Sequence, residues 1–327
     1  MKSHAKMAII YGAICGGCDV SLVNVGEHLA DILEKFNIIY WSIAVDGKTK
    51  ILRDVSEIDV AIFMGSIRTE ENLELAKLIK EKSKLIVAYG SCACYGGIPG
   101  LGTLINPRKI METMKSTITS KGDKPGRAIY DRLRIPPLLN TCNPLTKVVE
   151  PDILVPGCPP PPKSIERLFE ILSKFLNGEK PPKGLVLAET KSQCDECPRK
   201  PKDMTKLVMP GVFRLHEVVP QEDKCFLEQG IICLGPITRA GCDHCCIKAN
   251  MPCIGCMGPL PEVDDVGLKF ISSIASILLT DKEKEIGEQG LMEALNKIAD
   301  PQGIFYKYTL PVSHLIEIAL KRRRREK

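Results

Sequence analysis

Apolar and polar residues alternate along the first half of the chain with two different periods. Short, almost wholly apolar runs are typical of strands buried on both faces, and longer runs with apolar residues every three or four positions are typical of amphipathic helices. The apolar runs predict strands at 6–14, 38–45, 60–66, 85–91 and 152–157. The longer runs predict helices at 19–36, 69–84, 163–178 and near 106–117.

Regular alternation of strands and helices predicts an α/β fold, with a doubly wound parallel sheet covered by helices on both faces. Two residues mark helix ends: Thr69 is a good N-cap, and Gly178 follows the last helical position of its run. Binding sites in such sheets form in the loops beyond the carboxyl ends of the strands. We therefore expect the chemistry of the first half to lie there.

The second half of the chain has a different pattern. Residues 190–262 are rich in Cys, Pro and Gly and show little periodicity, and amphipathic helices are predicted after them at 265–280 and 284–300. The segment PPKG at 181–184 is typical of a boundary between domains. We predict a sheet domain over 1–182 and an irregular C-terminal domain with a few helices over 183–327.

Composition disfavours several classes of function. The chain has 327 residues, 44% hydrophobic and 26% charged, which suits a globular protein with a sizeable core. Aromatic residues make up only 5%, which disfavours stacking on nucleic-acid bases. Much of the net charge of +5 lies in the final KRRRREK, so a nucleic-acid partner is not indicated. That run is typical of a solvated tail, although an acidic partner would also suit it.

Targeting signals are not evident in the sequence. No apolar run reaches the roughly 18 to 20 residues that a membrane span needs. The N-terminal MKSHAKMAIIYGAICGG has only a short apolar run, which ends at a cysteine pair and not at a small-residue cleavage site. We expect a cytoplasmic protein with no membrane partner.

The 15 cysteines are the main chemical signal. An odd number cannot pair completely within one chain, and disulfides are rare in a reducing cytoplasm, so metal binding is the favoured role. Cys15 and Cys18 follow the first predicted strand, Cys92 and Cys94 follow the fourth, and Cys158 follows the fifth. Because these strands are parallel, the three loops should meet at one edge of the sheet.

The remaining cysteines are concentrated in the second half, mostly as close pairs with distant partners. That spacing suits cubane iron–sulfur clusters, and three such clusters would use twelve thiolates and leave three over. Zinc also takes four thiolates per site, so a zinc-stabilised interaction protein stays open, although the first site spans a whole sheet domain. The cysteines of the second half are Cys194, Cys197, Cys225, Cys233, Cys242, Cys245, Cys246, Cys253 and Cys256.

The order of motifs resembles the small, electron-transferring subunit of nickel–iron hydrogenases over nearly the whole chain. The motifs are ICGGC, GSCACYGG, VPGCPP, CDECPRK, CFLEQGIICLGPITRAGC and MPCIGCMGP. The resemblance implies a flavodoxin-like first domain that binds no flavin or nucleotide, and a C-terminal domain wrapped around clusters. It also implies that this chain relays electrons and has no catalytic residue of its own.

When the family's cluster ligands are carried over motif by motif, the resemblance implies three 4Fe–4S clusters. We name their ligands the proximal, medial and distal sets, in order of distance from the nickel–iron centre. The proximal set is Cys15, Cys18, Cys92 and Cys158. The medial set is Cys242, Cys246, Cys253 and Cys256, with Cys245 competing with Cys246. The distal set is Cys194, Cys197, Cys225 and Cys233.

Two departures from many family members narrow the resemblance. Cys194 stands where a histidine is common, and Cys246 adds a fourth medial thiolate, which should lower the potential relative to a three-iron cluster. Both departures, with the missing export signal, resemble the cytoplasmic enzymes of methanogens, of the methyl-viologen-reducing type that does not reduce the deazaflavin coenzyme. The implied partners are a nickel–iron large subunit and a downstream iron–sulfur acceptor of a heterodisulfide reductase complex.

Several alternatives remain at this point. The small subunit of the deazaflavin-reducing hydrogenase is the nearest rival, and a quinone-linked subunit is disfavoured because that family keeps one cluster. Cys94 and Cys142 are interpreted as packed thiols. Ordinary polar roles are expected for His216 and His244, and GGIPGLG at 96–102 lacks the Lys-Ser/Thr of a phosphate loop.

Overall fold

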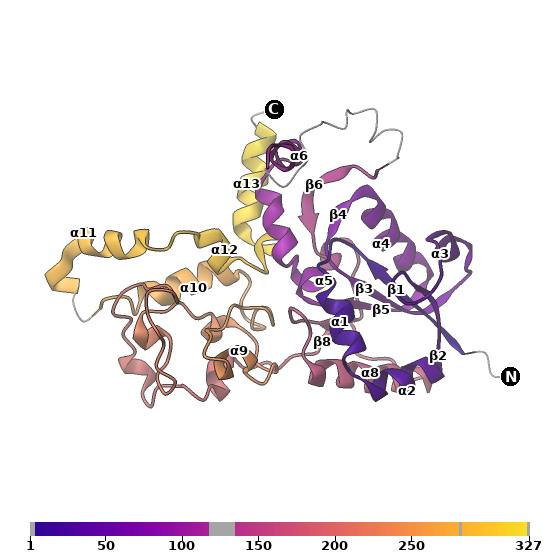
Figure 1. Ribbon diagram of the computed structural model, residues 1–327, viewed down its shortest axis with the longest axis horizontal. Coiled ribbons are helices and arrows are strands. Elements are labelled where there is room, and N and C mark those ends of the chain that lie inside the picture. Colours follow the sequence, from indigo (N-terminus) through magenta and orange to yellow (C-terminus); the bar gives the residue numbers. More distant parts are fainter. Residues whose placement is uncertain (1–3, 118–134, 281–282, 326–327) are drawn as a thin grey trace.

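Six parallel strands form the central sheet in the computed structural model, which describes residues 4–117, 135–280 and 283–325. The strand order is β2-β1-β3-β5-β7-β8, so the sheet grows outward on both sides of β1 and β3 (Figure 1). This order is that of a flavodoxin-like, doubly wound sheet, and the predicted fold class is confirmed. The strands are β1 (Ala5–Tyr11), β2 (Phe36–Trp41), β3 (Ile58–Met64), β5 (Ser83–Tyr89), β7 (Ile153–Val155) and β8 (Leu185–Val186).

Helices cover both faces of the sheet because alternate strand side chains point to opposite sides. On one face, Ile9 and Val87 are buried in the same cluster as side chains of α1 (Gly17–Val23), α2 (Glu27–Lys35) and α8 (Pro162–Leu176). On the other face, Ile10 and Phe63 are buried with side chains of α3 (Lys50–Asp54) and α4 (Glu70–Lys82). The strands are therefore apolar on both sides, which is why their sequences lack a polar alternation.

Two predicted elements differ from the structure. The helix predicted at 19–36 is two helices, because Gly26 has φ 61° and interrupts the helical backbone between α1 and α2. The strand predicted at 38–45 ends at Trp41, whose carbonyl accepts hydrogen bonds from the N–H groups of Ala44 and Val45. That tight turn ends the pairing with β1, although the apolar pattern continues.

The predicted end signals act as expected. Thr69 caps α4: its Oγ1 accepts from the Asn72 N–H at 3.2 Å, and Asn72 Oδ1 accepts from the Thr69 N–H at 3.1 Å. Gly178, with φ 95°, lies just past α8. The helix expected near 106–117 is α6 (Pro107–Ser116). Shorter elements between β3 and β7 were not predicted: β4 (Ile67–Thr69), α5 (Ser91–Tyr95), η1 (Ile98–Leu104), β6 (Leu138–Asn143) and η2 (Leu145–Lys147).

The C-terminal part forms a second lobe beside the sheet (Figure 1). Its first half consists of single helical turns: η3 (Gln193–Glu196), η4 (Met204–Lys206), η5 (Leu227–Gln229), η6 (Gly235–Ile237) and α9 (Cys245–Lys248). The later elements are α10 (Val266–Ala275), α11 (Glu283–Asn296), α12 (Pro301–Phe305), η7 (Leu310–Val312) and α13 (His314–Arg325). The two helices predicted at 265–280 and 284–300 correspond to α10 and α11, and α13 was not predicted.

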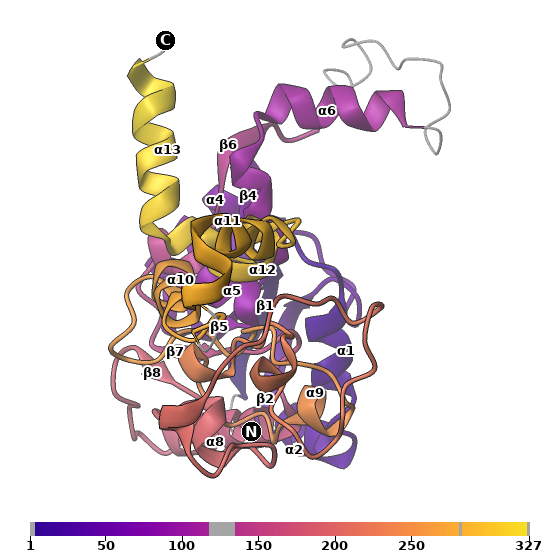
Figure 2. The same ribbon diagram turned by 90° about the vertical axis from the view of Figure 1, so that its left-hand side faces the viewer.

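The end of the chain returns to the sheet lobe, and α13 then projects from it. Figure 2 shows that α6 and α13 leave the body at the same end but diverge. The basic tail predicted to be solvated is described only as far as residue 325, within α13. In the parts of the chain that the structure covers, no helix combines the length and apolarity that crossing a bilayer would take. The division of the chain at 182/183 stays a prediction.

Asp265 joins α10 to the start of α13, and we expect Asp265→Ala to be strongly destabilising. Its Oδ1 accepts from the Leu268 N–H at 2.9 Å and its Oδ2 from the His314 N–H at 2.8 Å, while the side chain is only 6% exposed. Losing a helix cap and a buried long-range bond should cost about 2 to 4 kcal/mol. Thermal unfolding of the variant should occur roughly 5 to 10 °C lower.

Asp264→Ala is the matched control for this prediction, because Asp264 is exposed and adjacent in sequence. Its unfolding temperature should stay close to that of the native chain. Equal behaviour of the two variants would show that Asp265 does not anchor α13.

Candidate metal centres

The proximal set lies at the carboxyl ends of three strands of the sheet, as the sequence predicted for these loops; β5 and β7 are adjacent, and β3 separates them from β1. Cys15 follows β1, Cys92 lies in α5 directly after β5, and Cys158 follows β7. The loops that carry Cys92 and Cys158 are held together by backbone hydrogen bonds from Gly90 N to Val155 O at 2.8 Å and from Ser91 N to Gly157 O at 2.9 Å. Cys18 enters from the first turn of α1.

The four proximal thiols are close enough to influence one another's charge. Burial raises the pKa of Cys18, and the neighbouring thiols of Cys92, Cys158 and Cys15 raise it further. Burial, followed by Cys158 and Cys15, raises the pKa of Cys92 to about 12. A bound cation would reverse this effect, because positive charge favours thiolates. The arrangement is therefore one that a cationic group, and not four free thiols, would satisfy.

Two glycines give the proximal sulfurs their space. A Cβ on Gly90 would lie 2.5 Å from the Cys18 sulfur, and one on Gly97 would come as close to the sulfur of Cys92. Both glycines also have positive φ, which L side chains rarely adopt. The backbone thus forms a cradle around the sulfurs, and the four-thiol donor set inside it fits a cubane cluster.

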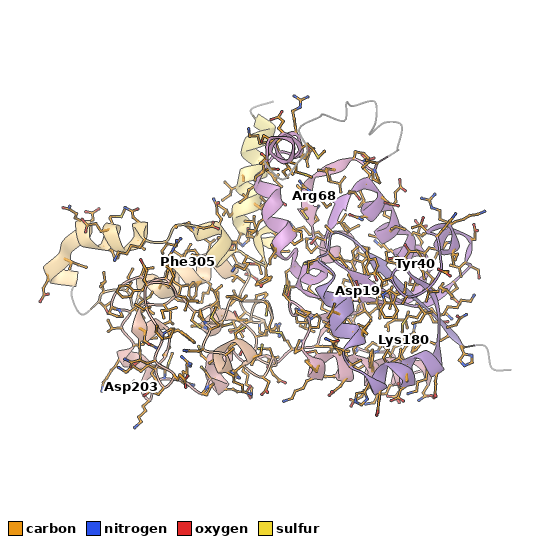
Figure 3. The ribbon with its side chains drawn as sticks, in the orientation of Figure 1. Asp19, Tyr40, Arg68, Lys180, Asp203 and Phe305 are labelled. Carbon is orange, nitrogen blue, oxygen red and sulfur yellow. The ribbon has the colours of Figure 1, made fainter. Side chains whose placement is uncertain are left out.

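Asp19 anchors the turn that carries Cys18. It is 5% exposed, and its Oδ1 accepts hydrogen bonds from the Tyr11 hydroxyl at 2.6 Å and from Trp41 Nε1 at 3.0 Å. Figure 3 places Asp19 at the α1 side of the sheet lobe. Because β1 and β2 both donate to it, the start of α1, and with it Cys18, is fixed to the sheet.

The distal set is gathered from η3 and from two loops further along the chain. Burial raises the pKa of Cys194, and the thiols of Cys233, Cys225 and Cys197 raise it further. Cys233 is 6% exposed, and burial raises its pKa to about 12. The four distal cysteines therefore form a second mutually close group of thiols.

The medial set lies between the other two. Burial raises the pKa of Cys256 to about 12, and the thiols of Cys242, Cys246 and Cys158 also act on it. Burial raises the pKa of Cys253, and its neighbours include Cys233, Cys256 and Cys242. The medial thiols are thus close to one another and also to one member of each adjacent set.

Direct hydrogen bonds join the sets. The backbone N–H of Cys158, a proximal residue, is close enough to the sulfur of Cys256, a medial residue, to oppose the rise in the pKa of that thiol. The backbone N–H of Cys253, a medial residue, donates to the sulfur of Cys233, a distal residue, at 3.3 Å. Ser91, at the start of α5, also donates its hydroxyl to the Cys256 carbonyl, which ties the sheet lobe to the medial segment.

The remaining cysteines and histidines lie as follows. Cys94 is 1% exposed and packs in the sheet core, where its thiol donates to the Ala88 carbonyl at 3.3 Å. Cys142 is fully buried, and burial raises its pKa to about 11. Cys245 is exposed and hydrogen-bonded to Cys246. His216 is exposed, whereas His244 is buried in the medial segment.

None of the 15 cysteines, which all lie in the described parts of the chain, is in a disulfide. Within residues 4–117, 135–280 and 283–325, no three His, Cys, Asp or Glu side chains converge tightly enough to hold a single metal ion. The thiolates of a cubane bind four different irons and so stand farther apart than the ligands of one ion.

Comparison with known proteins gives the family. The family model described as NADH ubiquinone oxidoreductase, 20 Kd subunit, matches residues 15–172, which include all four proximal cysteines. The iron–sulfur subunit of the F420-non-reducing hydrogenase of Archaeoglobus profundus is 35% identical, over 94% of this chain and 96% of that protein. The chain belongs to the family of F420-non-reducing hydrogenase iron–sulfur subunits.

Another member of the family and one solved structure are also similar to the chain. The corresponding subunit of the F420-non-reducing hydrogenase of Methanothermobacter marburgensis is 33% identical, over 98% of this chain and 99% of the relative. A chain of the H2-activated [NiFeSe]-hydrogenase of Dm. baculatum matches with a TM-score of 0.50 and 22% identity, over 80% of this chain and 96% of that chain. That likeness shows the fold alone. The chain is thus a hydrogenase subunit of the iron–sulfur, electron-transferring class.

Tyr308 is a site residue of this hydrogenase subunit that sequence reasoning missed. It reaches the proximal set from the far end of the sequence, where its hydroxyl is close enough to the Cys158 thiol to oppose the rise in the pKa of that thiol, and its carbonyl accepts from Gly97 N at 2.9 Å. It is 4% exposed. No local pattern marks it, because its partners are about 150 and 210 residues away in sequence.

We expect Tyr308→Phe to lower the reduction potential of a cluster held by the proximal set. A hydroxyl donor to a ligand sulfur stabilises the reduced, more negative cluster, so its loss should favour the oxidised form. Potentiometry followed by low-temperature electron paramagnetic resonance measures the change. Tyr306→Phe is the control, because the Tyr306 hydroxyl is bonded to Asp265 and not to a sulfur. Equal potentials in Tyr308→Phe and the native chain would contradict the assignment.

Proposed function

We propose that this chain is the non-catalytic electron-relay subunit of a nickel–iron hydrogenase and holds three 4Fe–4S clusters in a row. The proximal, medial and distal sets would be their ligands, as the motif resemblance implies. When bound, the clusters supply one-electron redox chemistry along the row. The remaining work falls to this chain, which holds the thiols, keeps water out and orders the three sets in space.

The observation that carries this proposal is the order of contacts between the sets. The proximal backbone N–H of Cys158 lies beside the sulfur of medial Cys256, and the backbone N–H of medial Cys253 donates to the sulfur of distal Cys233. The medial set therefore lies next to both others, as a relay needs if each electron is to cross only short gaps. Cys246, which acts on Cys256 and has a half-buried thiol, is the fourth medial ligand that we propose.

The proximal end is where we propose that the nickel–iron large subunit binds. Cys15 and Cys158 are exposed there, although their set partner Cys18 is buried. Large apolar side chains near these loops are also exposed: Val20 is 57% exposed, Val23 47% and Ile98 51%. Apolar surface beside a cluster site is well suited to burial against a protein partner. Dihydrogen would be oxidised in that partner.

Electrons would leave from the distal set to a downstream iron–sulfur subunit, proposed to belong to a heterodisulfide reductase complex in the cytoplasm. Relatives that are 35% and 33% identical to this chain are named F420-non-reducing hydrogenases, which supports the choice against the deazaflavin-reducing alternative. The acceptor itself is carried over from the motif resemblance.

Hydrogen uptake with and without the large subunit tests the proposed function. The full chain, purified anaerobically, should not reduce methyl viologen with dihydrogen by itself. The complex with its nickel–iron partner should do so, and its reduction of a downstream acceptor should require this chain. Robust hydrogen uptake by the nickel-free chain alone would contradict the division of roles.

A further inference from the structure

Gln193 lies at the junction of the distal and medial sets. It begins η3 and directly precedes distal Cys194, and it is only 1% exposed. Its backbone N–H donates to the Thr238 carbonyl at 2.8 Å, while Ser192 forms an antiparallel bridge with Arg239. The residue is therefore held by a short ladder to the segment that leads into the medial cysteines.

Both hydrogen bonds donated by the side-chain amide of Gln193 go to that segment. Nε2 donates to the Arg239 carbonyl at 3.0 Å and to the sulfur of medial Cys242 at 2.9 Å. The Arg239 carbonyl can only accept, so the nitrogen of the amide must face it and the two amide atoms cannot be exchanged. Oε1 is buried and has no partner among the described residues. The amide is thus oriented by what it donates to.

A second hydrogen bond runs in the opposite direction. His244, from the medial segment and 8% exposed, contacts the Gln193 carbonyl through Nε2 at 2.9 Å. Because a carbonyl only accepts, Nε2 carries the proton and donates. Gln193 and His244 therefore join the two segments by hydrogen bonds donated in both directions, and both residues are buried. Such locked partners fix the position of the sulfur between them.

We infer that Gln193 is a positioning residue that raises the reduction potential of the medial cluster and connects the distal and medial sets. The inference rests on the proposed function. Reduction adds negative charge to the cluster and its sulfurs, and an N–H donor to Cys242 stabilises that charge. Gln193 also connects Cys194 to Cys242. The path runs through the peptide unit between Cys194 and Gln193, along the Gln193 side chain, and across its hydrogen bond to the Cys242 sulfur.

The test measures the medial potential in the full chain, purified anaerobically with its native partners. Gln193→Leu removes both amide donors at similar volume, and Gln193→Glu keeps the shape but adds an acceptor and negative charge. At a fixed applied potential, Gln193→Leu should raise the ratio of oxidised to reduced medial cluster about tenfold, a shift of about 59 mV for one electron. Gln193→Glu should shift it at least as far in the same direction.

Gln229→Leu is the matched control. Gln229 also donates its amide near a ligand, but to the carbonyls of Gln221, Lys224 and Cys225 and not to a sulfur. In this variant, the ratio of oxidised to reduced medial cluster should stay within twofold of the native ratio. A tenfold shift in this control as well would assign the effect to general disturbance of the loops and overturn the inference.

A measurement on the native protein does not depend on whether a variant folds. With glutamine side-chain amides labelled with 15N, pulsed resonance of the reduced medial cluster should detect nitrogen coupling through the hydrogen bond to Cys242. Absence of coupling, or an unchanged potential in Gln193→Leu with full iron and sulfide content, would overturn the inference. Absence of any medial signal in native protein would instead overturn the proposed function, and the inference with it.

Discussion

Cys92→Ala should abolish electron flow from the nickel–iron subunit to any acceptor beyond this chain. Cys92 lies in α5 at the edge of the sheet, among the thiols of Cys18, Cys158 and Cys15. Loss of one thiolate of four should remove or degrade the proximal cluster. Dihydrogen-dependent reduction of the physiological acceptor should therefore fall by roughly 100-fold or more. Mutation of residues that only support metal ligands already costs up to about 100-fold, and loss of a ligand should cost at least as much.

Cys94→Ala is the matched control for this prediction. Cys94 is two residues away on the same short helix, but its thiol faces the core and bonds the Ala88 carbonyl. The variant should keep its activity and cluster signals and lose only about 1 kcal/mol of stability from the small cavity. Acceptor reduction assays and iron analysis of both variants check this. If Cys94→Ala lost acceptor reduction and Cys92→Ala kept it, Cys94 and not Cys92 would belong to the proximal set.

Cys246→Ala should convert the medial cluster to a three-iron form with a higher potential. The thiol of Cys246 lies near those of Cys242 and Cys256, so its removal should take away one iron ligand and one negative charge. Cluster type and charge help to set the potential, and a three-iron cluster is more easily reduced. The resonance signature of an oxidised three-iron cluster should appear, with about one iron fewer per chain.

Cys245→Ala distinguishes the two adjacent thiols. Cys245 is exposed, and it lies beside both Cys246 and Cys242. The variant should keep a four-iron medial cluster. A three-iron signal from Cys245→Ala, with none from Cys246→Ala, would make Cys245 the fourth ligand.

The sheet and the positions of the proximal loops could be predicted because their signals are local. Buried parallel strands are continuous apolar runs, and Cys15, Cys92 and Cys158 directly follow such runs in β1, β5 and β7. The break at Gly26 was missed because apolar periodicity continues through it, and only the backbone conformation ends the helix. Helix α13 was missed because its sequence reads as a charged tail.

The residues that join the sets could not be found from sequence. Gln193 donates to Cys242 across 49 positions, and Tyr308 reaches Cys158 from the other end of the chain. Neither residue type is a usual ligand of iron–sulfur clusters, and neither lies in a motif of fixed spacing. Their roles depend on which segments meet in space, which the fold decides and no local pattern records. The same holds for Asp265 and its bond to His314.

Anaerobic analysis of iron, acid-labile sulfide, zinc and nickel, combined with low-temperature electron paramagnetic resonance, tests the central claim most directly. Three 4Fe–4S clusters predict about twelve iron and about twelve sulfide per chain, no nickel, and three signals that titrate separately. Zinc bound to the thiols without acid-labile sulfide would contradict the account, and would make the chain a zinc-stabilised interaction protein.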